Sequence, residues 1–103
     1  KAINSASNTL ISGGDITVIT QGWDCTINDN TIRSRAVDTE DMTISGNAIL
    51  KLSAAGTSIY TGNNLNINGG STYSLTTDRN AESLNVKGAR QQTGGLILFG
   101  YSE

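Results

Sequence analysis

The chain has 103 residues, enough for one domain with a modest apolar core. With nine acidic residues, seven basic residues and no histidine it is nearly neutral, so the counterion release that drives nucleic-acid binding has little to act on. No apolar run approaches the roughly 20 residues that span a bilayer, and neither nucleic acid nor a membrane is an expected partner. We expect residues 1–103 to form a single domain, either a mature form without its signal peptide or a piece of a longer protein.

The composition favours an all-β fold. Asn, Thr, Ser and Gly supply 47 of the 103 residues, and Ile, Leu and Val supply another 22, against five aromatic residues. Helix-favouring residues never gather at three- and four-residue spacing, and β-branched residues dominate the apolar set. Short strands joined by small polar turns are therefore predicted.

The segment Leu10–Val18 is predicted to contain a strand, a glycine corner at Gly13-Gly14 and a second strand. Its counterpart follows after about 33 or 34 residues, a longer interval than the units further along the chain show. The excess predicts an inserted loop near residues 21–31.

Trp23 and Asp24 fall within this predicted loop and are candidate ligand-binding residues. An exposed indole can stack on a sugar ring, and the alternative for Trp23 is that it covers the open end of the core. Cys25 is the only cysteine and cannot form an internal disulfide. We expect it to be a small buried thiol, with intermolecular pairing as the alternative.

An internal repeat of 23 residues relates segments 35–57 and 58–80 without a gap. Apolar side chains alternate with polar ones in both segments, which predicts strands. The corner pairs Gly46-Asn47 and Gly69-Gly70 fall at equivalent places. A unit of this length with tight corners is typical of one coil of a parallel β-solenoid.

The 23-residue register places Ile44 on Ile67, Val37 on Tyr60 and Leu50 on Tyr73. Tyr60 and Tyr73 are therefore expected in the core or at its rim. One continuous core is predicted from Val37, Met42, Ile44, Leu50, Leu52, Leu65, Ile67, Tyr73 and Leu75.

The last predicted coil restarts at Leu84, 19 residues after Leu65, and ends in the apolar run 96–99 after Gly94-Gly95. Such irregular spacing suits a terminal coil, which either covers the open end of the core or packs against another segment or subunit that continues the core. The whole pattern predicts a parallel β-helix of about three to four coils. A β-meander or sandwich built from hairpins is the structural alternative.

Three phrases share one motif: Leu-Ile-Ser-Gly-Gly-Asp-Ile-Thr-Val (10–18), Met-Thr-Ile-Ser-Gly-Asn (42–47) and Leu-Asn-Ile-Asn-Gly-Gly (65–70). They resemble the "leucine/threonine-isoleucine-serine/asparagine-glycine-glycine" coil motif of bacterial carbohydrate-binding β-helix proteins, and the likeness covers most of residues 1–88. Lys1-Ala2-Ile3 and Arg35-Ala36-Val37 resemble the other half of such a coil. The resemblance implies a right-handed parallel β-helix, a secreted or cell-surface location, and polysaccharide binding with calcium held by acidic turns.

The chain departs from that family in its calcium turns, because Gly-Asp occurs only as Gly14-Asp15. The candidate metal ligands are instead Asp38, Glu40 and Asp41, whose carboxylates suit a hard cation. Oxygens of Asn63 or Asn64 in the next coil would complete the shell. The alternative is a solvated acidic turn whose carboxylates pair with Arg33 or Arg35.

The leading functional interpretation is a non-catalytic extracellular polysaccharide-binding module, with candidate ligand-binding residues Trp23, Asp24, Arg33 and Arg35. A structural or adhesive β-solenoid that assembles end to end through its terminal coils is the second interpretation. A polysaccharide lyase fragment is the third, because such enzymes combine acidic calcium ligands with a basic residue. We expect no enzyme activity, since the chain lacks histidine, the usual general base.

Overall fold

Three parallel sheets make up the body of the protein. The computed structural model describes residues 1–22 and 25–101, with the backbone alone for residues 25–27 and 30–32. Among these residues the first sheet contains β1 (Ile3–Asn4), β6 (Val37–Thr39), β9 (Ile59–Thr61) and β12 (Leu84–Val86). The second contains β2 (Asn8–Ile11), β7 (Asp41–Ile44), β10 (Leu65–Ile67) and β13 (Arg90–Gln92), and the third contains β3 (Asp15–Ile19), β8 (Ile49–Ala54), β11 (Ser71–Thr76) and β14 (Leu96–Tyr101).

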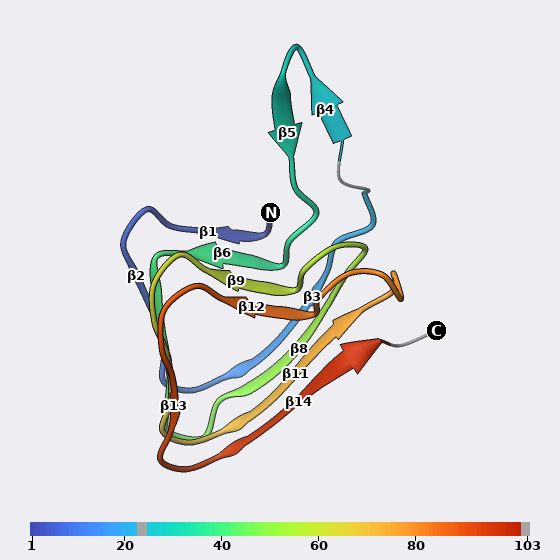
Figure 1. The fold of residues 1–103 in the computed structure, drawn as a ribbon. Coiled ribbons are helices and arrows are strands. Elements are labelled where there is room, and N and C mark those ends of the chain that lie inside the picture. The colour runs from blue at the N-terminus through green and yellow to red at the C-terminus, as the bar shows by residue number, and fades with distance from the viewer. Residues whose placement is uncertain (23–24, 102–103) are drawn as a thin grey trace.

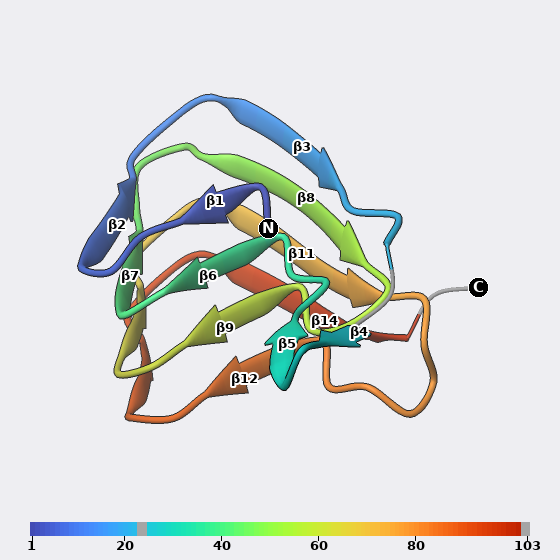
Figure 2. The same ribbon diagram turned by 90° about the horizontal axis from the view of Figure 1, so that it is seen from above.

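Successive strands of the chain visit the three sheets in turn, and each strand pairs in parallel with the strand one coil before or after it. The result is a right-handed parallel β-helix with a roughly triangular cross-section (Figures 1 and 2). The predicted fold class is confirmed, and the alternative built from hairpins is wrong. Over the described ranges, no helix is long and apolar enough to cross a membrane.

The predicted insertion is confirmed as an antiparallel hairpin of β4 (Cys25–Ile27) and β5 (Asn30–Ile32). Its turn residues Asn28 and Asp29 have φ values of 52° and 66°. Two consecutive positive φ angles define the turn that best matches the twist of a two-residue hairpin, and Asn and Asp tolerate it well. Figure 1 shows the hairpin projecting beyond β1 at one end of the coil stack.

The core prediction is confirmed for Val37, Met42, Ile44, Leu50, Leu52, Leu65 and Ile67, which are all fully or almost fully buried. Ile44 on β7 pairs with Ile67 on β10, as the 23-residue repeat predicts. Stacked aliphatic side chains from successive coils thus form a continuous column inside the helix.

The core prediction is wrong for Tyr73 and Leu75, which lie on the outer face of β11. Leu50 of β8 pairs with Thr72 rather than with Tyr73, and Leu52 pairs with Ser74 rather than with Leu75. The buried side chains of β11 are accordingly polar, namely Thr72, Ser74 and Thr76.

This change of register has its origin in corner length. Residues 45–48 connect β7 to β8, whereas only residues 68–70 connect β10 to β11. Because side chains in a strand alternate with a period of two, one residue fewer in the corner turns every side chain of the next strand to the opposite face. A gapless repeat therefore predicts the second sheet correctly and the third incorrectly.

The first sheet shows the same one-residue difference, since Val37 pairs with Ile59 and not with Tyr60. In the last coil Leu84 also pairs with Ile59, and Leu65 pairs with Arg90. The predicted match between Leu84 and Leu65 is therefore wrong, because the connection before β12 is longer than in the preceding coil.

Glycine is required at the corner between the second and third sheets. Gly46 and Gly70 have φ values of 66° and 76°, as expected for sharp corners. A Cβ at Gly70 would also collide with the backbone of Ala48 in the preceding coil. These corners stack too closely on one another to accept a side chain.

Candidate functional site

The outer face of the third sheet carries a shallow hollow of about 390 Å³. It is lined by Thr17, Ile19, Lys51, Leu52, Ser53, Tyr73 and Leu75. Leu52 points inward, and the other residues are the outward-facing positions of β3, β8 and β11. We call this surface the Tyr73 face.

The strand register brings Thr17, Lys51 and Tyr73 into one row across the sheet. Adjacent strands lie about 4.8 Å apart, so neighbouring side chains in the row can contact one ligand together. Tyr73 is half-buried and Lys51 is exposed. Part of the Tyr73 side chain is therefore open to solvent.

A second row of the Tyr73 face contains Ile19, Ser53 and Leu75. Ile19 keeps 66% of its surface exposed, and its aliphatic side chain stands beside a small hydroxyl. The face combines one aromatic ring, apolar walls, hydroxyl groups and one ammonium group. Almost all of the exposed surface in the hollow itself is apolar, so the hollow can pack against an apolar face of a ligand, with the polar groups of the row beside it.

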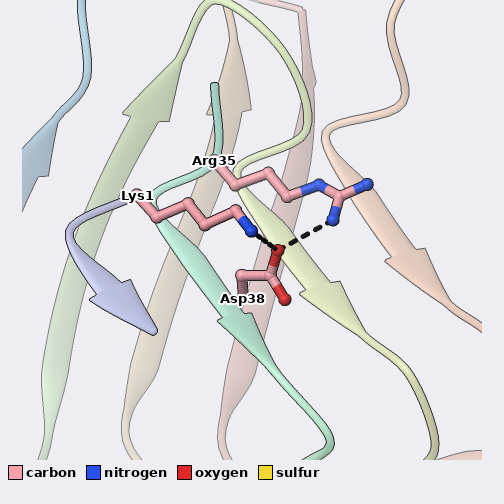
Figure 3. Close-up of polar contacts among 3 residues, drawn as sticks. All are labelled: Lys1, Arg35 and Asp38. Carbon is pink, nitrogen blue, oxygen red and sulfur yellow. Dashed lines mark hydrogen bonds and ion pairs between the residues drawn. The ribbon is translucent and has the colours of Figure 1, made fainter. Parts of the chain in front are cut away.

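Asp38 lies on the outer face of the first sheet, where the positively charged side chains of Lys1 and Arg35 bind its carboxylate (Figure 3). Lys1 Nζ lies 3.1 Å and Arg35 Nη1 lies 2.8 Å from Asp38 Oδ2. Burial acts to raise the pKa of Asp38, but hydrogen bonds from Arg35 and Lys1, together with their positive charges, outweigh it and hold the pKa below its ordinary value. Asp38 therefore stays ionised at neutral pH.

Arg35 also stacks on an aromatic ring. Its guanidinium carbon lies 3.8 Å from the ring centroid of Tyr60, which neighbours Asp38 across the sheet. This cation–π contact covers one side of the Tyr60 ring. Arg35, a candidate ligand-binding residue, thus contacts two partners of its own chain. Arg33, the other candidate arginine, is exposed directly after β5 and also interacts with its own chain.

The three candidate metal ligands are not brought together. Asp41 accepts a hydrogen bond from the backbone N–H of Asn64 at 3.1 Å, and the side chain of Glu40 is close to Gly62. Over residues 1–22 and 25–101, no three acidic, cysteine or histidine side chains are grouped so that they could hold a metal ion. The geometry therefore gives no support to a calcium site at Asp38, Glu40 and Asp41.

Asn64 was expected to offer an oxygen to the metal ion, but it does not do so. Its backbone N–H donates a hydrogen bond to Asp41, and its side-chain Oδ1 accepts a hydrogen bond from the N–H of Ala89 at 2.9 Å. The Asn64 side-chain oxygen therefore binds the backbone of the next coil. The alternative interpretation, in which an acidic residue of this segment pairs with Arg35, is the arrangement found for Asp38.

Trp23 and Asp24 lie outside the described residues, so their predicted roles remain predictions. The Tyr73 face was not predicted from the sequence, because the gapless repeat assigns Tyr73 and Leu75 to the core. The difference in corner length between Gly46-Asn47-Ala48 and Gly69-Gly70 was the signal that could have revealed it.

Comparison of the chain with protein-family models, with curated proteins and with solved structures finds no match in any of the three.

Proposed function

We propose that this chain is a non-catalytic, extracellular polysaccharide-binding module that holds its ligand on the Tyr73 face. The observation that carries the proposal is the outward Tyr73 ring in a row with Lys51 and Thr17. The coil motif that resembles carbohydrate-binding β-helix proteins supports the same ligand class. Secretion or display at the cell surface forms part of the proposal, because extended polysaccharides are met there.

The arrangement suits an extended polymer better than a small ligand. The hollow is shallow and open and extends over β3, β8 and β11. Side chains repeat along the helix axis at the strand spacing of about 4.8 Å. A polysaccharide lying across the strands would meet Thr17, Lys51 and Tyr73 in succession, with the Tyr73 ring as its main stacking contact.

A non-catalytic role is supported by Arg35 and Asp38 on the first sheet, because both side chains are already bound to other groups of the chain. The lyase interpretation assigns reactive roles to the acidic segment and to Arg33 or Arg35. Arg35 is stacked on Tyr60 and bound to Asp38, and Asp38 has a lowered pKa that makes it a poor proton donor at neutral pH.

The test is a pull-down of the native chain with insoluble polysaccharides, including a neutral β-glucan and a polyuronate, in excess chelator and in millimolar calcium. We expect retention on at least one polysaccharide, equal under the two conditions. Retention on none of them, with or without calcium, would contradict the proposal.

Variants then locate the site. Tyr73→Ala should weaken retention by roughly tenfold, equivalent to about 1.4 kcal/mol, whereas Tyr73→Phe, which keeps the ring, should bind nearly as the native chain does. Tyr60→Ala is the matched control, because it removes a tyrosine from the first sheet instead. If Tyr73→Ala melts like the native chain and is retained equally well, the ligand does not bind on the Tyr73 face.

A further inference from the structure

Asn68 lies at the corner between β10 and β11 and is followed by Gly69, which makes the one Asn-Gly pair of the sequence. Its side chain is exposed. The corner itself requires the glycine, because a Cβ at Gly69 would collide with the backbone of Gly46 in the preceding coil. The fold therefore places an exposed side-chain amide directly before a residue without a side chain.

The backbone nitrogen of Gly69 is available for reaction. The N–H groups on either side of it are held by the preceding coil. Asn68 donates its N–H to the carbonyl of Ile44 at 2.7 Å, and Ser71 donates its own to Ala48 at 2.8 Å. Over the described residues, the N–H of Gly69 donates no such hydrogen bond. Glycine also hinders the approach of its own nitrogen least, since it has no Cβ.

The last coil supplies a hydrogen-bond donor to the same asparagine. Thr93 Oγ1 donates a hydrogen bond to Asn68 Oδ1 at 2.8 Å. The backbone N–H of Thr93 donates to the carbonyl of Ile67 at 2.9 Å, which holds Thr93 beside the corner. A donor at Oδ1 draws electrons away from Cγ and stabilises the negative charge that the oxygen gains when Cγ is attacked. The Thr93 hydroxyl is thus placed to speed an attack on Asn68.

We propose that Asn68 is a site of spontaneous modification, which the folded chain converts to aspartate and isoaspartate with the help of Thr93. The Gly69 nitrogen loses its proton and bonds to Asn68 Cγ, the bond from Cγ to the side-chain nitrogen breaks, and ammonia leaves with the proton. The product is a cyclic succinimide. Water then opens the ring. Cleavage of the bond between the Gly69 nitrogen and Cγ gives aspartate, and cleavage of its bond to the main-chain carbonyl carbon gives isoaspartate.

The isoaspartate product would alter the corner more than the aspartate product. Its main chain runs through Cβ and Cγ and is therefore one carbon longer between β10 and β11. Gly95 of the last coil packs directly on Gly69, so the corner has little room for the extra carbon. We expect the isoaspartate form to melt at a lower temperature than the native chain. The reaction needs only water, so the inference does not depend on the proposed glycan binding.

The first test is incubation of the folded chain at mildly alkaline pH, which favours loss of the amide proton, followed by tryptic digestion and mass spectrometry. Conversion replaces NH2 by OH and so raises the mass of fragment 52–79. Electron-transfer fragmentation should assign the change to Asn68 and reveal both products. Hydroxylamine, which cleaves the succinimide, should release fragments 1–68 and 69–103.

Asn47 is the internal control for this test. It is also exposed and lies at the corresponding corner of the preceding coil, but it is followed by Ala48. Fragment 36–51, which contains Asn47, should keep its mass while fragment 52–79 gains mass.

Variants then test the part played by Thr93. Thr93→Val removes the hydroxyl and should slow the conversion of Asn68 in the folded chain roughly fivefold, the effect on a rate of losing one hydrogen bond of ordinary strength. Thr93→Ala, a second variant without the hydroxyl, should be slowed equally. Thr93→Ser keeps the hydroxyl and should convert like the native chain. In urea, where the coils separate, all four chains should convert at the same rate.

Three results overturn the proposal. The first is an unchanged Asn68 in the folded chain under conditions in which the chain in urea converts, because the fold would then protect the pair. The second is conversion of folded Thr93→Val and Thr93→Ala as fast as, or faster than, that of the native chain. The third is equal conversion of Asn47 and Asn68.

Discussion

Thr72 on β11 pairs with Leu50 on β8, so that a hydroxyl follows an aliphatic side chain inside the core. Thr72 is fully buried, and its Oγ1 is the buried side-chain polar atom without a hydrogen-bond partner in the described chain. An unsatisfied buried hydroxyl costs about 1–3 kcal/mol. We expect Thr72→Val, which keeps the shape and removes the hydroxyl, to raise the free energy of unfolding by about 1 kcal/mol in urea titrations.

Thr76 provides the control for this prediction, because it is buried on the same strand but its Oγ1 is hydrogen-bonded to Asp78. Thr76→Val should lower the free energy of unfolding by about 1 kcal/mol. Equal effects of both substitutions would mean that Thr72 has a partner in solution.

Ile67 tests the solenoid core directly. It is fully buried and lies between Ile44 and Gln92 of the neighbouring coils. A carboxylate at this place would be desolvated without a counterion, at a cost of several kcal/mol, which is comparable with the stability of a small domain. Circular dichroism should show that Ile67→Asp is unfolded.

Asn66→Asp is the matched control, because Asn66 is the outward neighbour of Ile67 on the same strand. It should remain folded with a nearly native melting temperature. A soluble, folded Ile67→Asp chain would place Ile67 outside the core.

Gly70 is predicted to be intolerant of any side chain. Its φ of 76° disfavours L-residues, and a Cβ would collide with Ala48. Gly70→Ala should therefore reduce the free energy of unfolding by more than about 1 kcal/mol. Gly13→Ala serves as the control, since a Cβ there meets nothing within 4 Å, and it should change stability by less than about 0.5 kcal/mol. Similar melting temperatures of the two variants would mean that the corners are more open than described.

The pairing of Asp38 should appear as a pH-dependent difference in stability. Its folded pKa lies below the unfolded value of about 3.9, so the ionised group stabilises the fold above that pH and loses this contribution as the pH falls through the folded pKa. Asp38→Asn should be less stable than the native chain at pH 7, by under about 1 kcal/mol. Urea titrations should show this gap closing as the pH is lowered below about 3.9. A gap that is constant with pH would contradict the charge pairing.

The sequence allowed the fold class, the position of the inserted loop and most of the core to be predicted, because alternation, glycine corners and the spacing of the repeats can be recognised without the structure; that the insertion is a hairpin was not predicted. Ile44 and Ile67 were matched correctly because the strands of the second sheet keep the 23-residue offset, which the first and third sheets do not. Tyr73 could not be placed by the same repeat. One residue fewer in the corner turns every side chain of the next strand to the opposite face, while the apolar pattern of the sequence stays almost unchanged. The pairing of Asp38 with Lys1 depends on strand β1 lying beside β6, a contact between residues distant in sequence.

The binding site itself is tested most directly by nuclear magnetic resonance of the labelled chain, titrated with a soluble fragment of whichever polysaccharide retains it. A binding site on the Tyr73 face predicts that the largest shift changes fall on Thr17, Lys51, Ser53 and Tyr73 of the third sheet, with the amides around Asp38 and Tyr60 unchanged. Shift changes centred on the first sheet or on the hairpin, with Tyr73 unaffected, would contradict it.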